Sequence, residues 1–281
     1  MIRDFKTNYA KLLEGFLNKL YANNECKVSL VKSRLLNFSN PEALLTKLNV
    51  TPNGDPIVEN TETIFIGKSI LTNNTSLDQK LKSDSFTRSE AFTTSTKTTQ
   101  GFNIGGSISA SFGFEIKIVN ISTSITINAS YNFSKEELQS STITNSITAP
   151  SQDILVPANS SVEVVAYFNK GVAKGKVNFE GILSGSDEVT FKLLHIPTGE
   201  TYTSTIYPYF RDLASINNLN PSDLGFGLGA TKNDLLLKGT GEYSSDIATQ
   251  YLLAVTPINK DGKKMGETTF FNVLPKISEK Y

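Results

Sequence analysis

The feature that most constrains the fold is an alternation of apolar and polar residues over residues 102–118. The even-numbered positions there are apolar, except for Gly106, and the odd-numbered positions are small, polar or charged. A period of two is that of a β-strand with one buried face and does not fit a helix. From residue 121 to Phe133 the alternation continues with the opposite parity. This change of phase places a chain reversal between the two segments and predicts a long amphipathic β-hairpin.

The alternation restricts how the two arms can pair. Apolar residues of both arms share one face only if the numbers of paired residues add up to an odd sum. We expect a sum of 239, which pairs Ile118 with Ile121 and puts the tip at Val119 and Asn120. A four-residue loop on the same sum fits equally well, because Val is strained in a two-residue turn. This register gives the pairs Ile116–Thr123, Phe114–Ile125, Phe112–Ile127 and Ala110–Ala129.

The polar face of the predicted hairpin carries almost no charge. Exposed strands of soluble sheets usually carry charged residues on the outer face, whereas this face holds Ser, Thr, Asn and Gly. A transmembrane β-barrel strand has this layout, with apolar residues toward lipid and small polar residues toward a water-filled lumen. The alternative is a hairpin that covers the core of a soluble protein. The six charged residues between 91 and 148 are Lys97, Glu115, Lys117, Lys135, Glu136 and Glu137.

The pore interpretation assigns a role to each face. About 9–11 residues per strand cross a bilayer, and each arm is long enough. The residues predicted to face the membrane are Phe102, Ile104, Ile108, Ala110, Phe112, Phe114, Ile116, Ile118, Ile121, Ile125, Ile127, Ala129, Tyr131 and Phe133. The residues predicted to face the lumen are Ser107, Ser109, Ser111, Glu115, Lys117, Ser122, Ser124, Thr126, Asn128 and Ser130. One hairpin alone would leave backbone groups unpaired in hydrocarbon, so we expect several chains to close a ring.

The rest of the chain is mainly β, after a small helical N-terminal part. Apolar spacings of three and four predict an amphipathic helix over 1–21, packed on a core or, alternatively, lying on a membrane surface. Asn40 and Pro41 are a helix start signal, so we expect a second helix over 40–48, followed by a chain break at 52–56. The predicted strands lie at 61–71, 154–156, 162–168, 177–183, 189–196, 202–207, 235–238, 249–256 and 268–273.

Charge and residue counts argue against several classes of function. Lys and Arg total 27, as do Asp and Glu, so the chain lacks the basic excess expected of a nucleic-acid binder. Cys26 and His195 are the only residues of their types, too few for a zinc site. We interpret His195 as structural and Cys26 as a buried or bystander thiol. We therefore expect no enzymatic activity, no metal and no cofactor. No apolar segment is long enough for a membrane-spanning helix, and charged residues interrupt the start, so we recognise no secretory signal.

One aromatic group is a candidate receptor site. Clustered Tyr and Phe side chains can stack on sugars or lie at a headgroup interface, and packing in the core is the alternative. The candidate residues for binding a glycan or protein receptor are Tyr202, Tyr207, Tyr209 and Phe210.

The order of these features resembles that of the aerolysin-type β-pore-forming toxins. The similarity is strongest to the epsilon-toxin and mosquitocidal-toxin branch that includes the parasporins. The resembling stretch runs from about residue 65 to 185. It comprises the Ser/Thr run 92–99, the amphipathic segment, the Ser/Thr strand 138–148, the segment 152–157 and the strand 162–168. The resemblance implies an elongated architecture of long twisted antiparallel strands.

The resemblance also implies three parts. The first is a head that binds a receptor or membrane, the second a middle sheet with the insertion hairpin 101–133, and the third a C-terminal β-sandwich. The expected boundaries are 1–60 with 186–234 for the head, 61–100, 134–152 and 169–185 for the middle sheet, and 153–168 with 235–281 for the sandwich.

The resemblance also implies that the protein is made as an inactive protoxin. A host protease trims such proteins, which then form homo-oligomeric rings on a target cell membrane, commonly of seven subunits. Members of the insecticidal branch accumulate in spore-associated inclusions, which fits the lack of a recognised signal. A non-lytic carbohydrate-binding or inclusion protein is the alternative function. Candidate cleavage sites near the ends are Arg3, Lys6, Lys11, Lys260, Lys263, Lys264, Lys276 and Lys280.

Overall fold

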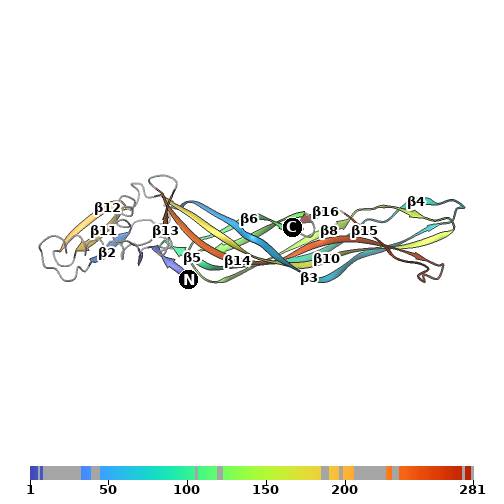
Figure 1. Ribbon diagram of the computed structural model, residues 1–281, viewed down its shortest axis with the longest axis horizontal. Coiled ribbons are helices and arrows are strands. Elements are labelled where there is room, and N and C mark those ends of the chain that lie inside the picture. The colour runs from blue at the N-terminus through green and yellow to red at the C-terminus, as the bar shows by residue number, and fades with distance from the viewer. Residues whose placement is uncertain are drawn as a thin grey trace.

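The described part of the chain is almost entirely β-strand and forms an elongated molecule (Figure 1). The computed structural model describes residues 1–5, 7–8, 33–38, 45–104, 107–118, 123–184, 190–195, 199–205, 226–229, 234–273 and 276–279. The predicted mainly β, elongated architecture is confirmed.

Three very long strands form the spine of the molecule. They are β3 (Leu45–Asn73), β10 (Ser160–Ser184) and β14 (Asp234–Ile258). β10 lies between the other two and is antiparallel to both. Where the sequence predicts two shorter strands on each of β10 and β14, the structure has one. The Gly- and Lys-rich stretch 169–176 has low β propensity, but it finds ladder partners on both sides and stays extended.

The spine carries further strands on the open edge of β14. The sheet order is β16-β8-β5-β14-β10-β3, and β13 and β15 also pair with β14. The strand that enters the hairpin region is β5, and a short strand, β1, runs parallel to its end. The bounds of these strands are β5 (Phe86–Asn103), β8 (Leu138–Ala149), β16 (Lys276–Glu279), β13 (Phe226–Leu228), β15 (Thr269–Asn272) and β1 (Ile2–Asp4).

Small sheets lie at the two ends of the molecule (Figure 1). One end holds β2 (Ser33–Phe38), β11 (Thr190–His195) and β12 (Glu200–Thr205), and the other holds β4 (Gln79–Lys82) and β9 (Asp153–Val156). The pairing of His195 with Glu200 confirms the turn expected between β11 and β12, and Gly199 in it has a φ of 70°. Beside the main sheet, β6 (Ser109–Ile118) and β7 (Thr123–Asn132) form a two-stranded sheet of their own.

The apolar residues form three clusters along the long axis. The largest lies between the β6–β7 sheet and the spine and contains Phe102, Phe133 and Phe179. The second surrounds Val164 and Leu253 at the β4–β9 end, and a small third cluster around Phe168 lies between them. The hairpin therefore covers the largest core of the described chain.

The predicted N-terminal helix is wrong at its start. Residues Ile2–Asp4 form strand β1 and pair in parallel with Gly101–Asn103 of β5. The chain turns helical only at Phe5, where the Asp4 carboxylate accepts a hydrogen bond from the Thr7 N–H (2.7 Å), as a helix N-cap does. Phe5 is fully buried in the largest core. Residues 9–21 lie outside the described part of the chain.

The second helix and the chain break are also corrected. Residues 45–48 are strand, and β3 continues through 52–56. Its pairing with β10 shifts there, from Asn53–Lys176 to Ile57–Lys174, so the Pro- and Gly-containing stretch forms a bulge. Gly54 takes up the positive φ, 79°, that the bulge requires. The local turn signal is real, but the edge of β10 offers hydrogen bonds on both sides of it.

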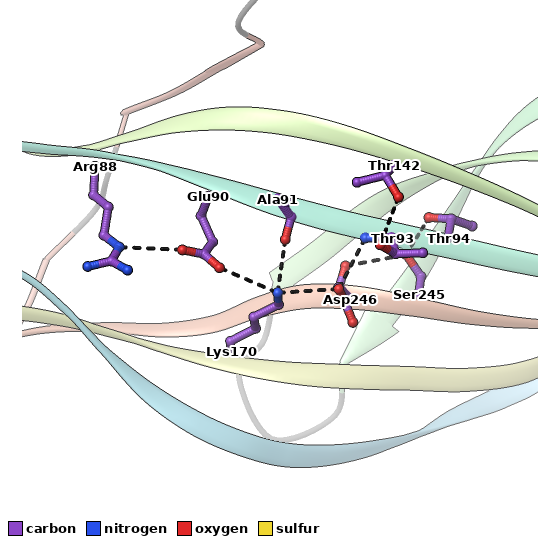
Figure 2. Close-up of polar contacts among 9 residues, drawn as sticks. All are labelled: Arg88, Glu90, Ala91, Thr93, Thr94, Thr142, Lys170, Ser245 and Asp246. Atoms are coloured by element: carbon purple, nitrogen blue, oxygen red, sulfur yellow. Dashed lines mark hydrogen bonds and ion pairs between the residues drawn. The ribbon is translucent and has the colours of Figure 1, made fainter.

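A partly buried lysine, Lys170, marks the level at which β5 and β14 separate (Figure 2). The last pair between these strands is Ser245–Thr94, and beyond it the Thr93 N–H donates to the Asp246 carboxylate (3.1 Å) instead of to a backbone carbonyl. Lys170 of β10 reaches into the gap. Its Nζ lies 3.3 Å from Asp246 Oδ2 and 3.6 Å from Glu90 Oε1 and donates to the Ala91 carbonyl (2.9 Å).

Candidate membrane-insertion hairpin

The predicted hairpin is present, in a register two residues from the expected one. β6 and β7 pair from Ser109–Asn132 to Ile118–Thr123, so the paired numbers add up to 241, not to 239. Phe114 thus faces Ile127, not Ile125. The sum is odd, as the alternation requires. The predicted tip, Val119 and Asn120, and the flanking Ile121 and Ser122 lie outside the described residues.

The two faces of the hairpin differ sharply in exposure. On the face with even positions of β6 and odd positions of β7, which we call the apolar face, Phe114 is 6% exposed, Ile116 2% and Ile127 2%. Ala129, Tyr131 and Phe133 are also buried. Ile108, Ala110, Phe112 and Ile125 are partly buried against the same core.

The opposite face of the hairpin, which we call the polar face, is open to solvent. Its exposed residues are Ser107, Ser109, Ser111, Glu115, Lys117, Thr126, Asn128 and Ser130. The hydroxyls of Ser111 and Ser130 lie 2.6 Å apart across the strands. The side chains of Ile118 and Ser124, one from each predicted set, are not among those described.

Aromatic residues of the spine form the surface on which the hairpin lies. The ring of Phe114 lies 5.2 Å from that of Tyr243 on β14, edge to face. On β10, Phe179 contacts Tyr131 (4.9 Å) and Phe133 (4.7 Å) between ring centroids. Sequence reasoning missed Phe179 and Tyr243 as partners of the hairpin. Their signal was weak, because each is one apolar position among many on a strand.

Glycines let the spine approach these rings. A Cβ at Gly241 would lie 2.4 Å from Phe179 Cζ and 2.9 Å from Tyr131 Cε1, and one at Gly175 would lie 2.5 Å from the Tyr243 hydroxyl. Burial raises the pKa of Tyr243. The surface under the hairpin is therefore shaped to these particular side chains.

Hydrogen bonds at Phe133, Ser134 and Thr96 tie the described part of the hairpin to the strands beside it. Phe133, which follows β7, accepts a hydrogen bond from the Phe102 N–H (2.9 Å) and donates its own N–H to the Ile108 carbonyl (2.8 Å). The Ser134 hydroxyl accepts a hydrogen bond from the Ile108 N–H (3.0 Å). Thr96 of β5 donates its hydroxyl to the Ser130 carbonyl. Side-chain packing thus holds most of the hairpin in place.

Other predicted sites are only partly described. Tyr202 lies on β12 opposite Leu193, whereas Tyr207, Tyr209 and Phe210 lie outside the described residues, as does Cys26. His195 lies at the end of β11. Among the described residues, no helix is long and apolar enough to cross a membrane, and no three His, Cys, Asp or Glu residues gather as metal ligands.

Comparison with known proteins identifies the family. Residues 14–269 match the family model described as Clostridium epsilon toxin ETX/Bacillus mosquitocidal toxin MTX2. The chain belongs to this family. Its members are β-pore-forming toxins of the aerolysin type, as the resemblance in the sequence predicted. No curated protein matches the chain.

Solved structures share the fold of this family member at low sequence identity. The Mpp75Aa1.1 β-pore-forming protein from Brevibacillus laterosporus is 20% identical with a TM-score of 0.73, covering 100% of this chain and 98% of its own. A chain of the Cry23Aa1–Cry37Aa1 binary complex is 21% identical with a TM-score of 0.60, covering 99% and 100%. A non-toxic crystal protein from Bacillus thuringiensis is 17% identical with a TM-score of 0.63, covering 89% and 96%. The fold therefore occurs in proteins described as pore-forming and as non-toxic.

Proposed function

We propose that this protein is a pore-forming toxin that stores its membrane-inserting element as the β6–β7 hairpin. On a target cell membrane, bound through a glycan or protein receptor, several copies assemble, and each contributes one hairpin to a transmembrane β-barrel. The observation that carries this proposal is the separation of the hairpin from the main sheet. Its backbone pairs with itself, its apolar face lies on the largest core, and its polar face is nearly uncharged.

The packing supports a reversible role for the apolar face. Burying a large apolar side chain contributes about 1.5–3 kcal/mol, so docking on the spine offsets the exposure of this face in water. Lipid replaces the spine after insertion, so the same side chains stay out of water in both states. The ladder within the hairpin keeps its backbone groups paired, and neighbouring subunits close the outer edges.

Terminal trimming fits the position of the C-terminal lysines. The turn after β14 exposes Lys260, Lys263 and Lys264. In this turn the side-chain oxygen of Asn259 (Oδ1) accepts a hydrogen bond from the Lys263 backbone N–H (2.8 Å). After cleavage there, only their ladders with β14 and β8 would hold β15 and β16. Dissociation of this segment would leave two strand edges unpaired, and such edges pair readily with another chain. We propose that a host protease cuts this turn and so permits assembly.

The outer parts of the molecule complete the proposal. We assign receptor binding to the expected head, 1–60 with 186–234, which includes β2, β11 and β12. The proposed boundaries at 60/61 and 168/169 lie at the level of the Lys170 cluster, where pairing shifts in both ladders of β10. With these boundaries, β3 would run through the head and the middle sheet, and β10 through the middle sheet and the C-terminal part.

The first experiment asks which residues meet lipid. Environment-sensitive dyes are attached to Phe112→Cys and Ile125→Cys on the apolar face, and to Ser111→Cys and Ser124→Cys as controls, all in a Cys26→Ser background. On trypsin-treated protein bound to phosphatidylcholine, phosphatidylserine and cholesterol liposomes, we expect a blue shift for the first pair only. Equal signals at all four positions would refute the assignment of faces.

A second experiment asks whether the hairpin must leave the spine. Phe114→Cys and Tyr243→Cys, whose native rings are 5.2 Å apart, are joined by a short reducible thiol cross-linker. We expect dye release from the same liposomes to fall to background, binding to persist, and reduction to restore release. Each single variant treated with the cross-linker is the control. Full lysis by the joined protein would exclude the hairpin, and binding without lysis by every form would favour a non-lytic binding or inclusion protein.

A further inference from the structure

Two ladders with different registers meet at Phe133. β5 and β8 pair from Phe86–Ala149 to Lys97–Leu138, so their paired numbers add up to 235. The hydrogen bond from the Phe102 N–H to the Phe133 carbonyl has the same sum, and the two rings stack at 5.7 Å. The hairpin pairs with the sum 241, and so does the bond from the Phe133 N–H to the Ile108 carbonyl. One residue of the second arm thus faces both Phe102 and Ile108.

The difference between 241 and 235 means that the first arm advances by six residues, from Phe102 to Ile108, while the second arm stays at Phe133. At their start, Phe102 and Ile104 are 2% and 1% exposed and belong to the core under the hairpin. At their end, Ile108 is held by Phe133 and Ser134. The difference is an even number, so the two ladders agree on which side is apolar. The six additional residues of the first arm therefore separate the β5–β8 ladder from the β6–β7 ladder, and both ladders belong to one two-stranded ribbon.

We propose that the hairpin slips by six residues when it leaves the spine, so that it continues the β5–β8 ladder in register 235. Residues 103–108 then enter the ladder and the tip moves toward Lys117 and Ile118. This inference rests on the proposed function, because it describes how the same hairpin extends. The new facing pairs are Ile104–Tyr131, Gly106–Ala129, Ile108–Ile127, Ala110–Ile125, Phe112–Thr123 and Phe114–Ile121.

Backbone hydrogen bonding favours the slip once the core contacts are gone. In a barrel that kept both registers, the excess at 103–108 would interrupt the ladder between the two arms, and backbone N–H and C=O groups without a partner are costly in hydrocarbon. In register 235 these residues face 127–132 and the ladder runs from Phe102–Phe133 without interruption. Because the ladder repeats every two residues, each backbone group that pointed to the other arm still does.

The side chains of the hairpin tolerate the new register. A polar strand face of Ser, Thr, Asn and Gly specifies register weakly, since one small pair replaces another. Ser111 exchanges Ser130 for Ser124, and Phe112 exchanges Ala129 for Thr123. The described charges of the hairpin, Glu115 and Lys117, are both on the first arm, so the slip brings no like charges face to face.

Slipping of the flanking β5–β8 ladder instead would cost more. Cross-strand hydroxyl pairs stabilise that ladder, and β8 is also paired with β16. The pairs are Thr87–Thr148 (2.8 Å), Ser89–Ser146 (3.5 Å), Thr93–Thr142 (2.9 Å) and Ser95–Ser140 (3.2 Å). Among the described strands, no third one pairs with the hairpin ladder, so it is the ladder that moves. In the soluble form the contacts of Phe114 with Tyr243 and of Tyr131 with Phe179 hold it at 241.

Pairs of cysteines introduced on the polar face can report which register the hairpin adopts, because each pair forms a disulfide in one register only. In a Cys26→Ser background, Ser111→Cys with Ser130→Cys matches the soluble register, and Ser109→Cys with Thr126→Cys matches the slipped one. Six residues of strand correspond to about 20 Å, so neither pair can form in the wrong register. Each protein is oxidised in solution and after trypsin treatment and flotation with phosphatidylcholine, phosphatidylserine and cholesterol liposomes, so that only bound protein is scored.

We expect the 111/130 pair to form in solution and the 109/126 pair to form at least tenfold more on liposomes than in solution. Oxidising 111/130 before binding should lower dye release at least tenfold, and reduction should restore it. Persistence of the 111/130 pair on liposomes, with full release by the oxidised protein, would overturn the slip while leaving pore formation intact. If reduced proteins release no dye, pore formation fails, and the cross-link pattern of the bound protein still decides the register.

Discussion

The hairpin β6–β7 and the spine β3–β10–β14 are both long amphipathic antiparallel strands, yet different forces hold them in place. Long ladders bind the spine strands to one another, and side-chain ion pairs such as Lys170–Asp246 strengthen the spine at the point where β5 separates from β14. The hairpin is bound to itself by a ladder and to the spine mostly by aromatic packing. Contacts through side chains can be exchanged for lipid, whereas a broken ladder leaves backbone groups unpaired.

The largest effect on stability should come from removing the spine residue on which the hairpin packs. Phe179→Ala removes a fully buried ring that contacts Tyr131 and Phe133, and we expect a loss of about 3–5 kcal/mol in the free energy of unfolding, measured by denaturant titration. Phe168→Ala, equally buried but away from the hairpin, is the matched control and should lose a similar amount. Only Phe179→Ala should increase proteolysis within the hairpin. If the hairpin were equally resistant to proteolysis in both variants, the idea that different contacts hold the hairpin and the spine would be wrong.

A smaller loss is expected at the Lys170 cluster in the spine. Lys170→Met keeps the aliphatic stem but leaves Glu90 and Asp246 without this cation, so we expect a loss of about 2 kcal/mol in the free energy of unfolding. Hairpin protection should not change below the transition. Lys174→Met, which removes an exposed ion pair with Glu59, is the control and should have little effect. A hairpin loosened selectively by Lys170→Met would show that the two regions are coupled.

Alkaline pH should release the hairpin before the spine unfolds. Burial raises the pKa of Tyr243 above its ordinary value of 10.0, so the unfolded or undocked form loses its proton first. The stabilisation is fully present below pH 10 and is lost as the pH rises toward the folded pKa, by about 1.4 kcal/mol per unit of pKa difference. We use proteolysis between pH 9 and 12 to measure exposure of the hairpin. In Tyr243→Phe this exposure should begin at a higher pH than in the unmodified protein. An unchanged profile would mean that another group controls release.

Tyr251 provides the matched case within the spine. Burial raises its pKa to about 12, and its hydroxyl has no hydrogen-bond partner among the described residues. Tyr251→Phe removes a buried polar atom, so it should change the free energy of unfolding by less than about 1 kcal/mol, and in the stabilising direction. It should leave alkaline release of the hairpin unaltered.

The smallest effect concerns ion selectivity on the polar face. Its described charges are Glu115 and Lys117, of opposite sign, so the pore should select weakly between ions. In planar bilayers under a salt gradient, Glu115→Gln should shift the reversal potential toward anions and Lys117→Gln toward cations, because each subunit repeats the charge in a ring. Unequal shifts would support the slip, which moves Lys117 to the tip and keeps Glu115 in the wall. Two unchanged potentials would mean that the other face meets water.

Much of the architecture follows from local pattern. The β class, the turn between β11 and β12 and the two faces of the hairpin were predictable, because strand periodicity and turn residues act over a few positions. The N-terminal residues show the limit of that reasoning. Ile2–Asp4 lies in an apolar pattern of helical period, but the free edge of β5 at Gly101–Asn103 pairs with it, and a tertiary ladder overrides local propensity. The strand through 52–56 follows for the same reason.

The register of the hairpin shows most clearly what the local sequence determines and what the tertiary structure determines. The sequence by itself determined that the sum of paired numbers is odd, because any even sum would place apolar residues opposite polar ones. It did not determine which odd sum, since 235, 239 and 241 give the same two faces. The tertiary structure decided for 241 in the hairpin and 235 in the flanking ladder, with Phe133 in both. The reason is that periodicity is unchanged by a shift of two residues, whereas the contacts of Phe114 with Tyr243 and of Tyr131 with Phe179 are not.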